Sequence, residues 1–186
     1  MRTKDPDKQH RIKEALVQMI LTEGIQGTSV SKIAKAAQVS PATIYVYYSS
    51  KEEMLAEVFR EYSHQSYHYL MRRIHPRMPA AELVDSIVRG FYDYTLCHED
   101  VFSFVEQCSR CPTLMEMVCE EECCCDVFGI LHEYQNRGEI RKYSDDVLSA
   151  LLFSPVRSLA NEKKPQDSID ESLTELISAL TKLLTI

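Results

Sequence analysis

The sequence predicts an all-α protein with a small N-terminal helical domain and a larger helical body. Apolar residues recur at helical spacing in almost every long segment, and only five glycines and few Val-Ile-Thr alternations are present. The N-terminal part of the sequence is basic and the rest is acidic. Residues 1–51 carry eight Lys/Arg against four Asp/Glu, whereas residues 52–186 carry 13 against 24. We therefore expect a polyanion-binding domain over 1–51 and an acidic domain over 52–186.

Three helices are expected in the first domain. Apolar residues predict the first helix over 8–22, and Gly24 and Gly27 end it. A second, short helix follows a Thr28 or Ser29 cap and turns an apolar face inward. In the third, Ser40 is the expected cap and Pro41 occupies the first turn, where a missing N–H does no harm.

Two short helices joined by a tight turn are typical of a helix-turn-helix motif. In the third helix, Ile44 and Tyr48 lie one turn apart and are expected to face inward. Ala42, Thr43, Val46 and Tyr47 are left facing outward. The small groups of the first three residues, 41–43, lie at the helix N-terminus, which can approach a phosphate or a base edge.

Residues 28–55 resemble the DNA-binding domain of the tetracycline-repressor (TetR) family. The most specific part is Thr-Ile-Tyr-x-Tyr-Tyr-x-Ser-Lys-Glu-Glu, which starts at Thr43 and ends at Glu53. One departure is Gln38, where the family often has glycine in the turn, and a non-glycine residue there implies mild strain.

The resemblance implies that one group of residues holds the DNA backbone: Thr28, Thr43, Tyr47 and Lys51. It places another group nearest the base edges of the major groove: Ser31, Pro41, Ala42, Thr43 and Tyr45. Lys51 begins a helix, where a cation opposes the helix dipole, so a phosphate partner would explain its position. Alternatively, the three tyrosines at 45, 47 and 48 are core aromatics and Lys51 is solvated.

Six helices are expected in the body, over 50–74, 80–97, 99–109, 113–137, 144–162 and 167–184. Ser50-Lys51-Glu52-Glu53 is a capping box that opens the first of them. Most of the expected breaks contain proline, at 76, 79, 112 and 165, or glycine, at 138, and one falls at His98-Glu99.

The last two helices carry leucine stripes, and the resemblance implies that they pair with a second copy as a four-helix homodimer interface. The residues assigned to this interface are Leu148, Leu152, Leu159, Leu173, Leu176 and Leu180. A homodimer would also double the number of bases read. Alternatively, both stripes close the core of a single protomer.

Aromatic and methionine side chains in the middle helices are candidates for a small-molecule (inducer) pocket, which the resemblance implies somewhere within 80–137. The assigned residues are Phe91, Tyr94, Phe102 and Met115. Taken singly, such side chains at helical spacing are more often ordinary core.

Six of the seven cysteines lie between Cys108 and Cys125. They could bind a thiophilic metal or sense redox state, but on a helix adjacent cysteines point apart and no second Cys-x-x-Cys completes a zinc site. Inert cysteines are therefore favoured, and no metal or cofactor is assigned. His64 and His68, one turn apart, are treated as surface residues.

These observations predict a sequence-specific transcriptional regulator that binds double-stranded operator DNA as a homodimer and is released by a small-molecule inducer. The chain contains no Gly-rich phosphate loop or nucleophile elbow, so an enzyme is not expected. We expect a cytoplasmic protein, because no apolar stretch resembles a secretory signal or a membrane span. Two alternatives stay open: a regulator that senses a thiophilic metal or redox state through the cysteines from 108 to 125, and one controlled by a protein partner that docks on the acidic body.

Overall fold

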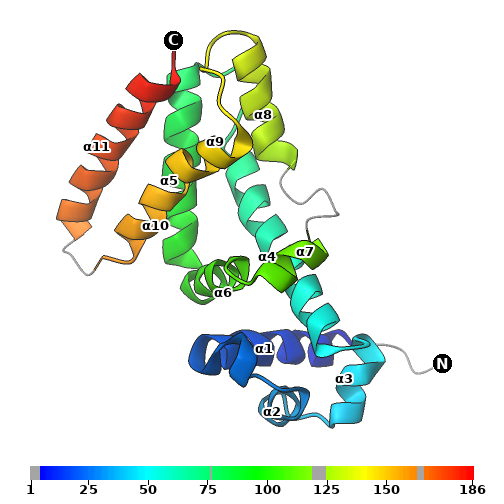
Figure 1. Ribbon diagram of the computed structural model, residues 1–186. Helices are drawn as coiled ribbons and strands as arrows, with labels where there is room; N and C mark the ends of the chain where they lie inside the picture. Colours follow the sequence, from blue (N-terminus) through cyan, green and yellow to red (C-terminus); the bar gives the residue numbers. More distant parts are fainter. Residues whose placement is uncertain (1–4, 76, 119–124, 163–165) are drawn as a thin grey trace. The chain divides into compact units, whose positions relative to one another are not determined.

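The computed structural model describes residues 5–75, 77–118, 125–162 and 166–186. Their regular structure is helical, apart from an isolated bridge between Ile140 and Thr185, so the predicted all-α fold is confirmed. The helices, labelled in Figure 1, are α1 (Pro6–Gly27), α2 (Val30–Ala36), α3 (Pro41–Tyr47), α4 (Lys51–Met71), α5 (Ala80–Cys97), α6 (Glu99–Ser109), α7 (Pro112–Val118), α8 (Cys125–Asn136), α9 (Asp145–Leu152), α10 (Ser154–Ala160) and α11 (Gln166–Leu184). None of the helices in the described ranges is long and apolar enough to cross a bilayer.

The helices form two compact units, and neither unit is continuous in sequence. Unit 1 comprises Met1–His64 and Glu99–Cys123, and unit 2 comprises Gln65–His98 and Cys124–Ile186. Helix α4 therefore contributes residues to both. The domain boundary after residue 51 follows charge and motif, and it stays a prediction about function.

Two of the predicted helices differ from the structure. The expected helix over 144–162 is wrong as a single element, because α9 ends at Leu152 and α10 begins at Ser154. Pro155 lies in the first turn of α10, where its ring and missing N–H prevent an α-helix from continuing through it. The expected helix over 113–137 contains α7 and α8, and residues 119–124 lie outside the described residues.

In unit 1, α1 packs against both α2 and α6, and α2 packs against α3 (Figure 1). The largest fully buried side chains of this unit come from α1–α4 and α6: Ile12, Leu16, Ile20, Ile33, Ile44, Tyr48, Met54 and Phe104. Tyr62 of α4 meets Phe104 edge to face, with ring centroids 5.9 Å apart. This apolar core fixes the inner faces of α2 and α3, so their opposite faces are left to solvent.

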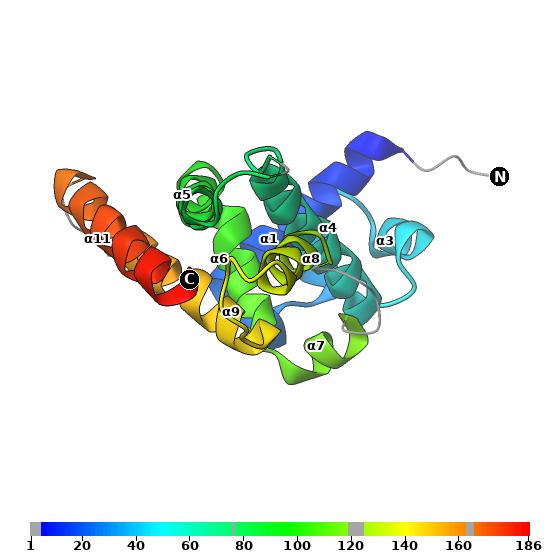
Figure 2. The same cartoon turned by 90° about the horizontal axis from the view of Figure 1, so that it is seen from above.

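In unit 2, α5 packs against α9, α10 and α11. Seen from above, α5 and α8 are both nearly end-on, so their axes run in a similar direction (Figure 2). Gly90 lets the end of α4 come close, because a Cβ there would lie 3.0 Å from Leu70 Cδ2 and 3.2 Å from Arg73 Cδ. The same approach lets Arg73 Nη1 donate to Asp93 Oδ2 at 2.6 Å, and this ion pair raises the pKa of the Arg73 guanidinium.

Candidate nucleic-acid interface

The turn after α2 is built by backbone hydrogen bonds around a left-handed residue. Ser29 caps the helix, and its hydroxyl accepts from the Lys32 N–H at 3.4 Å. At the other end, the Val39 N–H donates to Ala34 O at 2.9 Å and the Gln38 N–H to Lys35 O at 3.3 Å. These bonds are the pattern of a Schellman motif. Gln38 adopts φ +56°, the left-handed region in which mild strain was expected.

Helix α3 is held by one face and exposed on the other. The Ser40 hydroxyl caps it by accepting from the Thr43 N–H at 3.1 Å. Ile44 and Tyr48 are buried as predicted, whereas Pro41, Ala42 and Tyr45 are exposed. Tyr45 shows 57% of its surface, a high value for a large aromatic side chain. The residues placed nearest the base edges, with Ser31 on α2, therefore lie on accessible surface, except for the half-buried Thr43.

Two predicted DNA-backbone residues of α3 have partners within the protein. The Thr43 hydroxyl lies 2.9 Å from the Ser40 hydroxyl. The Tyr47 hydroxyl accepts from the Asp5 N–H at 2.9 Å and donates to Asp5 O at 3.0 Å. Tyr47 therefore ties the start of α1 to the end of α3, a link between residues 42 positions apart that no sequence motif indicated.

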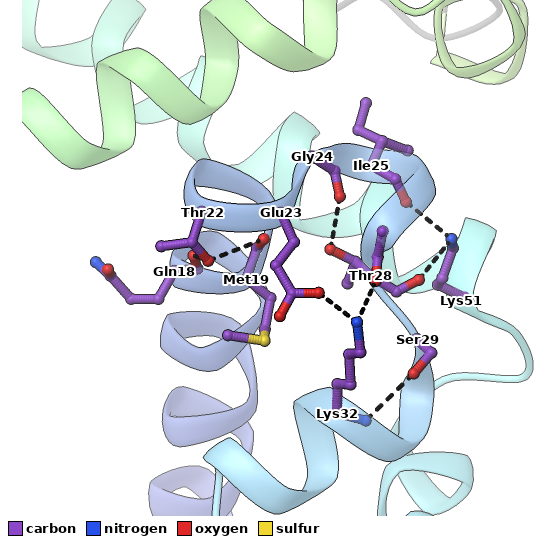
Figure 3. A network of polar contacts seen from close by, with 11 residues as sticks. Gln18, Met19, Thr22, Glu23, Gly24, Ile25, Thr28, Ser29, Lys32 and Lys51 are labelled. Carbon is purple, nitrogen blue, oxygen red and sulfur yellow. Dashed lines mark hydrogen bonds and ion pairs between the residues drawn. The ribbon is translucent and has the colours of Figure 1, made fainter.

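Thr28 and Lys51 both stabilise the C-terminal end of α1 (Figure 3). Thr28 is 4% exposed, and its hydroxyl donates to Gly24 O at 2.8 Å. Lys51 Nζ donates to Ile25 O at 3.1 Å and to Thr28 O at 3.0 Å. A cation is favourable at a helix C-terminus, so these carbonyls explain why Lys51 is tolerated at the start of α4. Their contact with DNA stays a prediction.

Lys32 joins α2 to the same end of α1, which sequence reasoning missed. Its ammonium group is ion-paired with Glu23 and donates to Gly27 O at 2.9 Å (Figure 3). The neighbouring Ser31 is exposed. The second helix therefore has an inner edge fixed on α1 and an outer edge open to a partner.

The predicted ligand residues belong to different units. In unit 2, Phe91 is buried against Phe153 with centroids 4.9 Å apart, and Tyr94 is buried between Tyr69 and His98. Of the unit 1 residues, Phe102 is buried and Met115 is half-buried. Their assignment to a ligand site stays a prediction.

Most of the leucines assigned to a dimer interface are covered by unit 2 itself. Those at 148, 152, 173 and 180 are buried, and those at 159 and 176 are half-buried. Leu183 of α11, which belongs to the same leucine stripe, is 43% exposed, and Val147 of α9, which was not part of either stripe, is 40% exposed. The spacing of the leucines does not show which of these side chains the protomer itself buries, so the sequence could not predict this difference in exposure.

The two described cysteines of the cluster have opposite pKa shifts. Cys108 is buried, and burial raises the pKa of its thiol to about 12, so it is a neutral thiol at pH 7. A hydrogen bond from Thr113 lowers the pKa of Cys111. Among the described residues, no group of His, Cys, Asp and Glu could hold a metal ion. Cys119, Cys123 and Cys124 lie outside the described residues, as does the side chain of Cys125.

Two short helices joined by a tight turn, with one buried and one exposed face, have the geometry of a helix-turn-helix, the motif of many DNA-binding proteins. Residues 12–58 match the family model described as "Bacterial regulatory proteins, tetR family". By this match residues 12–58 form a DNA-binding domain of the TetR-family type, and the chain has the fold of TetR-family regulators. The family and fold are those of regulators rather than enzymes.

Three matches illustrate the similarity. An uncharacterized HTH-type transcriptional regulator of Haemophilus influenzae is 24% identical over 170 residues, 88% of this chain and 87% of that protein. The fatty acid metabolism regulator protein of Bacillus subtilis is 43% identical over 61 residues, 33% of this chain and 31% of that protein. The crystal structure of FadR from Bacillus subtilis in complex with stearoyl-CoA aligns with a TM-score of 0.73 and 23% identity, covering 92% of this chain and 97% of that one.

Proposed function

We propose that this regulator binds operator DNA as a homodimer in the cytoplasm, with α3 in the major groove, and that an acyl ligand releases it. The observation that carries the DNA half is the exposure of Pro41, Ala42 and Tyr45 on a helix whose opposite face is locked into the core. Apolar and hydroxyl groups on that surface suit contacts with thymine methyls and base edges. The excess of Lys and Arg over Asp and Glu in residues 1–51 favours binding to the phosphates of the DNA backbone next to those bases.

The homodimer proposal is supported by apolar surface on the last helices. Val147 and Leu183 are exposed, and Leu159 and Leu176 are half-buried, on α9, α10 and α11. A symmetric interface uses the same surface on both copies. Two recognition helices could then occupy successive major grooves, about 34 Å apart.

The ligand half is supported by likeness to the regulators concerned with fatty acids. The structure similar over 92% of this chain was determined with stearoyl-CoA bound. We propose a long-chain acyl compound as the ligand, bound within the helical body. Binding would shift α4 and alter the separation of the two recognition helices, so that both no longer fit the operator.

The decisive experiment is selection of duplexes from a random pool by the purified protein, followed by fluorescence anisotropy on the selected site. A palindromic consensus and a salt-dependent affinity are expected. Added dodecanoyl-CoA or dodecanoate should weaken operator binding. A monomeric protein without salt-dependent affinity for any duplex would contradict the DNA half, and affinity unchanged by either compound would contradict the ligand half.

A further inference from the structure

Arg157 of α10 lies beside an aromatic cluster in unit 2. Its Cζ is 5.9 Å from the centroid of the Phe91 ring. Phe91 packs against Phe153 at 4.9 Å, and Phe153 against Phe128 at 6.3 Å between centroids. Helices α5 and α8 and the junction of α9 and α10 thus bring three aromatic rings together, and one of them, Phe91, lies beside the guanidinium group.

The Nε–H group of Arg157 is buried without a hydrogen-bond acceptor among the described residues. An unpaired buried donor on a charged group is unfavourable, and such a group in a native protein calls for an explanation.

The other two half-buried arginines of unit 2 have carboxylate partners. Arg73 pairs with Asp93 at 2.6 Å, and Arg89 Nε donates to Asp85 Oδ1 at 2.9 Å. Residues 52–186 contain 24 acidic against 13 basic side chains, so acidic partners are abundant in the sequence. Even so, none of the described carboxylates is paired with Arg157.

We infer that Arg157 binds the anionic headgroup of the ligand while the aromatic cluster around Phe91 contacts its apolar chain. A guanidinium group pairs with carboxylate or phosphate through parallel hydrogen bonds, and both anions fit this role. The two sources are a free fatty acid, through its carboxylate, and an acyl-CoA, through its phosphates. This inference rests on the proposed function and adds the chemical class and the anchoring residue.

The test is isothermal titration calorimetry of the full chain with dodecanoate, dodecanoyl-CoA and the uncharged 1-dodecanol. The wild-type protein should bind at least one anionic compound at least tenfold more tightly than the alcohol, and the compound that binds identifies the source of the anion. R157M should lose that tenfold preference and bind the alcohol unchanged. R89M, which removes an arginine already paired with Asp85, is the matched control and should keep the preference.

The temperature of thermal unfolding without ligand is a second measurement. A purely structural role of Arg157 predicts that R157M unfolds at a lower temperature than the wild type. Since the buried Nε has no partner to lose, R157M should unfold at the same temperature as the wild type or higher. If R157M unfolds earlier and keeps the preference for anions, Arg157 serves only the last turn of α10 and the inference is wrong. If none of the three compounds binds the wild type, the acyl-ligand half of the proposed function fails as well, whereas operator binding is unaffected.

Discussion

The change K51M tests whether Lys51 is a structural cap of α1. Methionine keeps the length of the apolar stem but removes the two hydrogen bonds to Ile25 O and Thr28 O. Each hydrogen bond to a charged group contributes roughly 1.5–3 kcal/mol. The two share one half-buried ammonium, so their contributions are not additive, and removing a cation from the start of α4 restores about 0.3–1 kcal/mol. We expect a net loss of about 2 kcal/mol.

For a chain of this length, about 2 kcal/mol lowers the unfolding midpoint by roughly 4–8 °C. Circular dichroism measures that midpoint. K35M is the matched control, because Lys35 is exposed on α2, and it should unfold as the wild type does. The reasoning is refuted if K51M keeps the wild-type midpoint. A drop of about 0.9 in the slope of log affinity against log salt would then identify Lys51 as a phosphate contact instead.

Four further predictions concern α3 and the buried ionisable groups. Y45A should lower operator affinity about tenfold in fluorescence anisotropy, since a good base contact contributes roughly 1–3 kcal/mol. Because the ring is exposed, the same change should alter the free energy of unfolding by less than about 0.5 kcal/mol. I44A should reduce the free energy of urea unfolding by about 2–5 kcal/mol, because the side chain is buried. Burial raises the pKa of Tyr48 from 10.0 to about 12, so the stability it contributes is complete below pH 10 and is lost as the pH rises towards 12. Urea titrations across that range should show a smaller fall for Y48F than for the wild type, and equal falls would contradict this assignment. Iodoacetamide followed by peptide mass spectrometry should modify Cys111 before Cys108, because the thiol pKa is lowered at Cys111 and raised to about 12 at the buried Cys108.

The sequence predicted the helix-turn-helix from local signals. The Ser40 cap, the proline after it and the spacing of Ile44 and Tyr48 depend on neighbouring residues, so the ends and the buried face of α3 agree with expectation. The break of α9 from α10 also had a local cause in Pro155, but the apolar pattern ran through it and masked the signal. Periodicity reports which residues share a face and does not by itself show where a helix ends.

By itself, the sequence determined the fold class, the helix-turn-helix and the buried face of α3, because helix periodicity and capping act over a few residues. Only the tertiary structure decided where polar side chains find their partners. Tyr47 meets Asp5, Lys51 meets the end of α1, and Arg157 meets the Phe91 ring instead of a carboxylate. Each of these contacts joins residues that are far apart in the chain. They come together because the helices pack against one another, which residue spacing alone does not show.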